Sequence, residues 1–177
     1  MNIPNKLTLL RIFLVPVFAA CFYINHEYKY YIAAFVFIAA YLTDIFDGSY
    51  ARKHNIVTTF GKFMDPIADK LLTGSAIIML VSDGLLHPIA ALVFIGREFI
   101  ISGFRLVAAG SEEGKVLLWQ AKTVTQCIAI VLLLLKNPIF GRIGIRMDTI
   151  MVMISLVFTV WSAYDYIYKN RKLIKYD

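Results

Sequence analysis

The chain has 177 residues, of which 59% are apolar, and it carries a net charge of +6. A water-soluble domain is nearer to about 45–50% apolar, so this composition excludes a soluble globule and indicates a single membrane-embedded domain over residues 1–177. No basic motif interleaved with aromatic residues is present, so the positive charge predicts membrane orientation and no nucleic-acid partner.

Apolar segments follow one another along the chain, each near the roughly 20 residues that a helix needs to cross a bilayer. We predict transmembrane helices over residues 5–24, 30–51, 66–84, 88–109, 115–136 and 148–168. The alternative for the first segment is a signal peptide ending at "FAAC", but Phe18, three residues before Cys21, fits a cleavage site poorly. The expected fold class is therefore an all-α membrane protein with six transmembrane helices and a cytoplasm-facing polar cavity.

The distribution of Lys and Arg predicts how the chain is oriented. With six spans both termini lie on one side, and that side takes all of the 18 Lys and Arg residues except Lys29, Lys136, Arg142 and Arg146. Cytoplasmic loops of membrane proteins are enriched in Lys and Arg. We therefore expect both termini and the 52–65 connection to be cytoplasmic, with the basic tail "YKNRKLIKYD" at anionic lipid headgroups.

Four aspartates interrupt the apolar pattern in "YLTDIFDGSYARKHNIVTTFGKFMDPIADKLL", residues 41–72. On helices, one face would carry Asp44, Asp47, Gly48, Ala51 and Arg52, and a second face would carry Gly61, Asp65 and Asp69. The connection between them, about residues 53–60, is short. The two helices are therefore expected to be antiparallel neighbours whose polar faces meet near the cytoplasmic boundary.

Carboxylates clustered at that boundary would repel each other unless cations lay between them. Oxygen ligands without Cys or His favour Mg²⁺ or Mn²⁺, and two carboxylate pairs can hold two such ions, which suits phosphoryl chemistry. Gly48 and Ala51 leave room for a ligand, and the Arg52 guanidinium can donate two hydrogen bonds to one phosphate. The alternative, in which the aspartates cap helices or pair with Arg52 and Lys62, explains one aspartate better than four on two matched faces.

The spacing D-x2-D-G-x2-A-R-x8-G-x3-D-x3-D, from Asp44 to Asp69, resembles the motif of the CDP-alcohol phosphatidyltransferases. The resemblance implies a six-helix membrane protein, typically a homodimer, that transfers a phosphatidyl or similar group from a CDP-linked donor to an alcohol and releases CMP. It also implies site residues: metal binding by Asp44, Asp47, Asp65 and Asp69, a base at Asp69, and CDP contacts at Gly48, Arg52 and Gly61.

The opening "NIPNKLTLLR" resembles the N-x-L-T-x2-R start of the phosphatidylglycerophosphate synthases, a branch of that family. Asn5, Thr8 and Arg11 recur on roughly one helix face, and the resemblance places Asn5 and Thr8 near the nucleotide. The alternative is a helix cap followed by a positive flank on the first span.

The segment "GREFIISGFR", residues 96–105, resembles the G-R-E-x3-S-x2-R stretch of the same synthases. A charged pair inside a span is costly and functional by default, although Arg97 and Glu98 could instead form a purely structural pair. Glu98, Ser102 and Arg105 share one helix face.

The segment "GKVLLWQAKTVTQ", residues 114–126, carries Lys115, Trp119, Lys122 and Gln126 on one helix face. Lys115 could merely extend its ammonium to the membrane–water interface, whereas Lys122 lies deeper in the predicted span and is the better candidate. We expect a basic pocket beside the metals, built from Arg97, Arg105, Lys115 and Lys122, with Glu98 and Ser102 orienting the acceptor.

Such a pocket suits an acceptor that carries its own phosphate. The predicted reaction is therefore transfer of the phosphatidyl group from CDP-diacylglycerol to glycerol 3-phosphate, which gives phosphatidylglycerophosphate and CMP. Three alternatives stay open: phosphatidylglycerol as acceptor, as in cardiolipin synthesis; a membrane prenyltransferase; and a cation transporter, since carboxylates within spans often mark ion paths.

Overall fold

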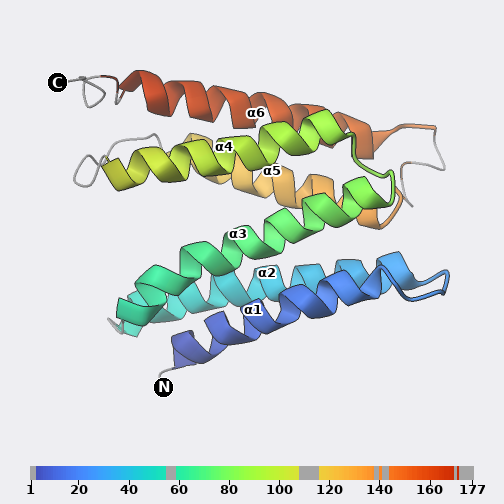
Figure 1. Cartoon of the computed structure of the whole chain (residues 1–177), viewed down its shortest axis with the longest axis horizontal. Helices are drawn as coiled ribbons and strands as arrows, with labels where there is room; N and C mark the ends of the chain where they lie inside the picture. Colours follow the sequence, from blue (N-terminus) through green and yellow to red (C-terminus); the bar gives the residue numbers. More distant parts are fainter. Residues whose placement is uncertain are drawn as a thin grey trace. The chain divides into compact units, whose positions relative to one another are not determined.

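The computed structural model describes the backbone of residues 3–54, 59–107, 116–137, 140, 144–169 and 171, with side chains outside the description at 3–4, 44–54, 59–60, 62, 105–107 and 116–120. Within the described residues the regular structure consists of α-helices (Figure 1): α1 (Ile3–Cys21), α2 (Lys29–His54), α3 (Thr59–Ser82), α4 (Pro88–Val107), α5 (Val116–Leu134) and α6 (Met147–Lys169). The predicted all-α class is confirmed for this part of the chain.

Each predicted segment corresponds to one of these helices, and the largest difference is at the start of α3. The predicted span begins at residue 66, whereas α3 begins at Thr59 and contains Pro66 in its interior. The expected span followed apolar residues, but helical hydrogen bonding continues through the polar stretch that precedes them. As a result Asp65 lies within the helix, ahead of the apolar part of α3.

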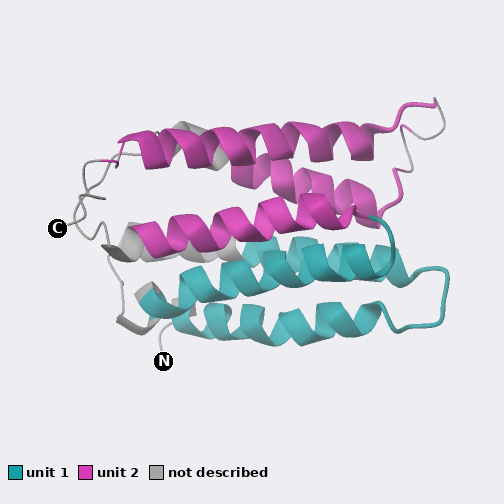
Figure 2. Ribbon diagram, turned by 45° about the horizontal axis from the view of Figure 1, so that its top comes forward, with its two compact units in different colours: residues 1–85 teal, residues 86–177 magenta. Residues whose placement is uncertain are grey.

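The chain divides into two compact units, Met1–Leu85 and Leu86–Asp177 (Figure 2). Unit 1 consists of α1, α2 and α3, and unit 2 consists of α4, α5 and α6. In unit 1 each pair of helices is in contact, and in unit 2 α6 contacts both α4 and α5. The expectation that the whole chain acts as one domain stays a prediction.

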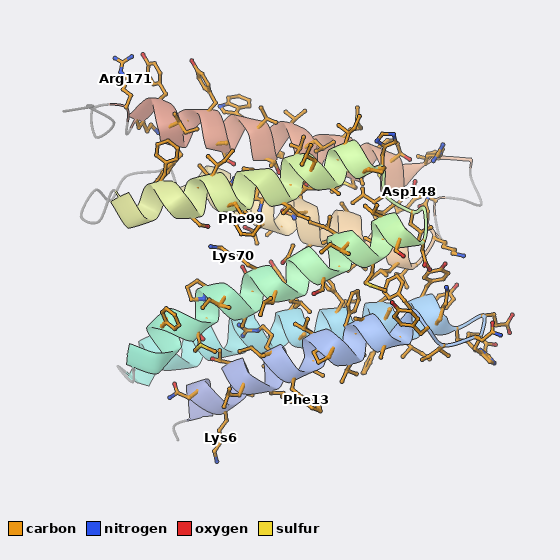
Figure 3. The ribbon with its side chains drawn as sticks, viewed as in Figure 1. Lys6, Phe13, Lys70, Phe99, Asp148 and Arg171 are labelled. Atoms are coloured by element: carbon orange, nitrogen blue, oxygen red, sulfur yellow. The ribbon has the colours of Figure 1, made fainter. Side chains whose placement is uncertain are left out.

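Aromatic rings and alanines form the core of unit 1. Phe18 of α1 contacts Phe22 edge-on at 5.4 Å between ring centroids and Phe37 of α2 at 5.9 Å. Ala33 and Ala68 are fully buried on α2 and α3, and their small side chains let helix backbones approach closely. On the outside of the unit, Lys6 and Phe13 project away from α1 (Figure 3), and Phe13 is 68% exposed.

A polar contact joins the start of α2 to the end of α3. The Lys29 ammonium lies 2.8 Å from Oδ2 of Asp83, and the Tyr30 hydroxyl donates to the same oxygen at 2.9 Å. The hydrogen bond with Asp83 raises the pKa of Lys29, which precedes the predicted span. Gly84 follows α3, with a φ of 70°, and its N–H donates to the Val81 carbonyl. Glycine adopts this left-handed conformation after a helix without strain.

Helix α6 of unit 2 buries its polar residues and exposes its apolar ones. Ser155, Thr159 and Ser162 are buried, whereas Val157, Val160 and other large apolar residues of α6 are exposed. In water this arrangement would be unfavourable, but in lipid small polar residues are the ones that helix interfaces select. Among the described helices, α6 alone is both long and apolar enough to cross a membrane, and only 17% of its most apolar stretch is buried.

Candidate active site

One end of unit 1 collects the parts of its helices that carry the sequence motifs. The first half of α1 holds the "NKLT" opening, the last half of α2 holds "DIFDGSYAR", and the first half of α3 holds "GKFMDPIAD". Because α2 runs antiparallel to both α1 and α3, these three segments lie at the same end of the unit (Figure 1). The tertiary structure therefore brings the opening motif to the same end of unit 1 as the aspartate motif.

A hydrogen bond links α1 directly to the aspartate motif. The Thr8 hydroxyl donates to Oδ1 of Asp65 at 2.6 Å, a length typical of a hydroxyl bound to a carboxylate. Thr8 is 1% exposed and Asp65 is exposed, so this bond is partly buried. The Thr8 hydroxyl therefore binds a residue of α3, whereas a helix-capping hydroxyl would bind the backbone of its own helix.

Two other residues of the opening motif are also buried. Asn5 is 9% exposed and Arg11 is 1% exposed. An arginine that served only as a positive flank would extend to water or lipid headgroups. The burial of Arg11 in α1 instead fits a role within unit 1.

Asp65 and Asp69 lie one helical turn apart on α3, and they differ in burial. Asp65 is exposed, although one of its oxygens accepts the bond from Thr8, and Asp69 is partly buried. The i, i+4 spacing places both on the same face. Gly61, one turn before Asp65, is buried and adds no side chain to that face.

Half of the predicted metal set lies outside the described side chains. Asp44 and Asp47 belong to the helical backbone of α2, as do Gly48 and Arg52, but nothing is described of their side chains. Among the side chains that are described, His, Cys, Asp and Glu form no group of three around a common point. The donor chemistry of Asp65 and Asp69, two carboxylates on one face, is nevertheless what a hard divalent ion requires.

Unit 2 holds a second cluster of charged side chains, on α4 and α5. The Lys122 ammonium of α5 forms an ion pair with Oε1 of Glu98 on α4. Arg97 is buried, and its Nη1 lies 3.6 Å from the same carboxylate oxygen. The three groups comprise two cations and one anion, so the cluster carries a net positive charge.

The structure places the remaining predicted residues of unit 2 as follows. The Ser102 hydroxyl donates to the Glu98 carbonyl of its own helix at 2.5 Å. Arg105 lies on α4 with its side chain outside the description, and Lys115 lies outside the described residues altogether. Three of the predicted residues, Arg97, Glu98 and Lys122, are thus brought together by the fold.

One member of this cluster was not predicted. Nη2 of Arg97 donates to the Ser162 hydroxyl of α6 at 3.0 Å, and that hydroxyl donates to the Thr159 carbonyl at 3.0 Å. The pattern S-x3-T-x2-S in the last span places Ser155, Thr159 and Ser162 on one helix face. This spacing of small polar residues is visible in the sequence and could have predicted the buried face of α6.

A family model described as CDP-alcohol phosphatidyltransferase matches residues 1–161. The chain belongs to the CDP-alcohol phosphatidyltransferase family. That match covers all six helices except the end of α6, so it includes all of unit 1 and most of unit 2.

Similar members of the CDP-alcohol phosphatidyltransferase family have nearly the same length as this chain. A protein of Bacillus subtilis named CDP-diacylglycerol–glycerol-3-phosphate 3-phosphatidyltransferase is 39% identical over 188 residues, which covers 98% of this chain and 97% of the relative. Proteins with the same name from Rickettsia felis and Pseudomonas fluorescens are 39% and 36% identical, over 93% and 94% of this chain. They match 93% and 89% of the respective relatives.

Proposed function

We propose that this protein transfers the phosphatidyl group from CDP-diacylglycerol to glycerol 3-phosphate, which gives phosphatidylglycerophosphate and releases CMP. Relatives that cover nearly the whole chain carry the name of this transferase. The structural observation that carries the proposal is the bond from Thr8 to Asp65. It joins the opening motif, which resembles the start of the phosphatidylglycerophosphate synthases, to the aspartate motif.

The proposed metal site uses Asp44 and Asp47 of α2 with Asp65 and Asp69 of α3, and we propose that it holds two divalent cations, Mg²⁺ or Mn²⁺. Bound ions of this kind would neutralise the donor pyrophosphate and stabilise the departing CMP. Thr8 donates to one oxygen of Asp65, which fixes the orientation of the carboxylate. Asn5, Gly48, Arg52 and Gly61 are proposed to complete the binding of the CDP part.

In the proposed reaction Asp69 acts as the general base. Its carboxylate accepts the proton of the acceptor hydroxyl as that oxygen attacks the β-phosphorus of CDP-diacylglycerol. The bond between the β-phosphorus and the bridging oxygen breaks, and CMP departs with that oxygen. The position of Asp69 one helical turn after Asp65, on the same face of α3, supports this role.

We propose that unit 2 binds the phosphate of the acceptor through Arg97, Arg105, Lys115 and Lys122. The net positive charge of the described cluster supports this assignment. An ammonium has three N–H donors, so Lys122 can bind Glu98 and a phosphate oxygen together. In this proposal Glu98 keeps Lys122 in place, and Ser102 contributes to the same face of α4.

The proposed setting is a bacterial cell membrane, crossed by six helices, with both termini and the active site on the cytoplasmic side and the protein acting as a homodimer. The apolar exposed face of α6 supports a membrane location. The excess of Lys and Arg near the termini and the 52–65 connection supports the orientation.

A CMP-release assay with the purified protein and CDP-diacylglycerol tests the proposed function. We expect release that requires a divalent cation and glycerol 3-phosphate. Asp69→Asn should reduce the rate by about 10²–10⁴-fold, the usual contribution of a general base, and Asp65→Asn should also reduce it severely. Release with phosphatidylglycerol but not glycerol 3-phosphate would refute the proposed acceptor, and full activity of both variants would refute the metal site.

A further inference from the structure

The guanidinium of Arg97 is oriented by a helix far away in the sequence. Nη2 donates to the Ser162 hydroxyl at 3.0 Å, and both residues are buried, with Arg97 7% exposed and Ser162 7% exposed. Helices α4 and α6 pack directly against each other within unit 2. The bond therefore ties a charged group in the middle of α4 to the last helix of the chain.

The geometry around Ser162 sets the direction of this bond. A serine hydroxyl has one proton to donate and two lone pairs that accept. The proton is directed to the Thr159 carbonyl at 3.0 Å. The lone pairs are consequently available to the Arg97 guanidinium, and the hydroxyl acts there as an acceptor of defined orientation.

The contact of the guanidinium with Glu98 is longer than its bond to Ser162. Nη1 lies 3.6 Å from Oε1 of Glu98, beyond the range of a good hydrogen bond. Arg97 and Glu98 are neighbours in one helix, where consecutive side chains diverge and do not face each other. Glu98 also binds Lys122, so its carboxylate is shared between two cations. The bond from Arg97 to Ser162 therefore has hydrogen-bonding geometry, which the contact with Glu98 lacks.

We infer that Ser162 is a positioning residue for acceptor binding: it holds the Arg97 guanidinium in the orientation that receives the phosphate of glycerol 3-phosphate. This inference rests on the proposed function, which assigns Arg97 to the acceptor phosphate. A guanidinium binds phosphate best when two N–H groups approach two oxygens together. Rotation of the guanidinium about its stem would lose that paired geometry, while leaving the donor site of unit 1 unchanged.

Ser155 offers a matched control on the same helix face. It is buried like Ser162, but its hydroxyl makes no hydrogen bond to any residue that the structure describes. Replacing either serine by alanine removes one hydroxyl from the buried face of α6. Of the two substitutions, only Ser162→Ala removes a hydrogen bond to Arg97.

The test measures CMP release by the full-length protein as glycerol 3-phosphate and CDP-diacylglycerol are varied separately. We expect Ser162→Ala to raise KM for glycerol 3-phosphate about tenfold, the lower end for a hydrogen bond to a charged group. Its kcat and its KM for CDP-diacylglycerol should change by less than about twofold, within the usual error of additivity. Ser155→Ala should leave all three constants at the wild-type values.

Two further variants separate positioning from general loss of structure. Ser162→Thr keeps the hydroxyl and is expected to retain a KM for glycerol 3-phosphate near that of the wild type. Ser162→Ala added to Arg97→Lys should raise KM little beyond Arg97→Lys alone, because lysine lacks the planar fork that Ser162 orients. Independent, multiplicative effects of the two substitutions would overturn the inference.

The outcomes distinguish this inference from the proposed function. Wild-type protein without CMP release that depends on glycerol 3-phosphate would overturn the proposed function and the inference together. A wild-type protein active with glycerol 3-phosphate, whose Ser162→Ala and Ser155→Ala variants have the same KM, would overturn the inference alone. An equal rise of KM for both substrates in Ser162→Ala would assign Ser162 a structural role only.

Discussion

At the scale of single residues, two buried hydroxyls each join a helix to a charged group on another helix. The Thr8 hydroxyl donates to the Asp65 carboxylate in unit 1, and the Ser162 hydroxyl accepts from the Arg97 guanidinium in unit 2. Hydrogen bonds to charged groups are about twice as strong as neutral ones, and burial further strengthens the bond between Arg97 and Ser162. Such bonds orient a carboxylate or a guanidinium without adding charge to the site.

Removal of the Thr8 hydroxyl should weaken metal binding. Thr8→Val keeps the shape of the side chain but leaves Oδ1 of Asp65 without this donor, and loss of an outer-shell hydrogen bond typically lowers metal affinity about 10–100-fold. We expect that loss in Mn²⁺ binding followed by electron paramagnetic resonance on the purified protein without substrates. Thr8→Ser should bind Mn²⁺ nearly as tightly as the wild type.

The matched control for Thr8→Val is Thr125→Val. The Thr125 hydroxyl donates within its own helix, to the Ala121 carbonyl at 2.8 Å, so its removal should leave Mn²⁺ affinity unchanged. Equal Mn²⁺ affinity in Thr8→Val and wild-type protein would show that Thr8 does not orient a metal ligand.

At the scale of helices, α2 and α3 are joined at one end by a polar contact and carry the aspartate motif at the other. Lys29 and Tyr30 at the start of α2 both bind Asp83, which follows α3. The proposed metal ligands lie toward the opposite ends of these helices, on 44–47 and 65–69. The Asp83 contact therefore stabilises the helix pair whose register aligns the two halves of the motif.

Substitution of Asp83 should destabilise unit 1 more than loss of an ordinary surface pair. Asp83→Asn keeps the shape but removes the negative charge that both Lys29 and Tyr30 contact at Oδ2. We expect a lower Tm in detergent than that of the wild type. The control is Asp165→Asn, which removes the i, i+4 pair with Lys169 on α6; pairs of this kind contribute about 0.3–0.5 kcal/mol. Equal Tm values for the two variants would contradict a role for Asp83 in joining α2 to α3.

At the scale of the whole molecule, apolar side chains face outward on both units. Phe13 of unit 1 is 68% exposed and Phe99 of unit 2 is 75% exposed, and both are labelled in Figure 3. At the end of α6, Arg171 lies 4.5 Å over the Tyr168 ring, and Tyr168 stacks on Tyr164. Tyrosines and basic residues at a helix end are typical of a membrane–water interface.

The proposed orientation can be measured by labelling single cysteines in intact cells. In a background without Cys21 and Cys127, Glu27→Cys lies in the turn between α1 and α2 and should react with a membrane-impermeant maleimide added outside. Arg171→Cys, after α6, should react only once the cells are permeabilised. Both positions are exposed, so a difference in labelling reports the side of the membrane. The reverse pattern would contradict cytoplasmic termini.

The sequence alone determined the all-helical class, the approximate helix positions and the family. It could do so because apolar runs of bilayer length and carboxylates at helical spacing depend only on local order along the chain. The start of α3 was less predictable. This helix begins well before its apolar residues, because backbone hydrogen bonding does not depend on side-chain polarity.

Only the tertiary structure decided which side chains meet across helices. The bond of Thr8 to Asp65 joins residues 57 positions apart, and the bond of Arg97 to Ser162 joins residues 65 positions apart. No local pattern encodes such pairs, because they depend on how helices rotate and pack against each other. For that reason the sequence predicted no site residue in the last span, whereas packing within unit 2 brings its Ser162 to the guanidinium of Arg97.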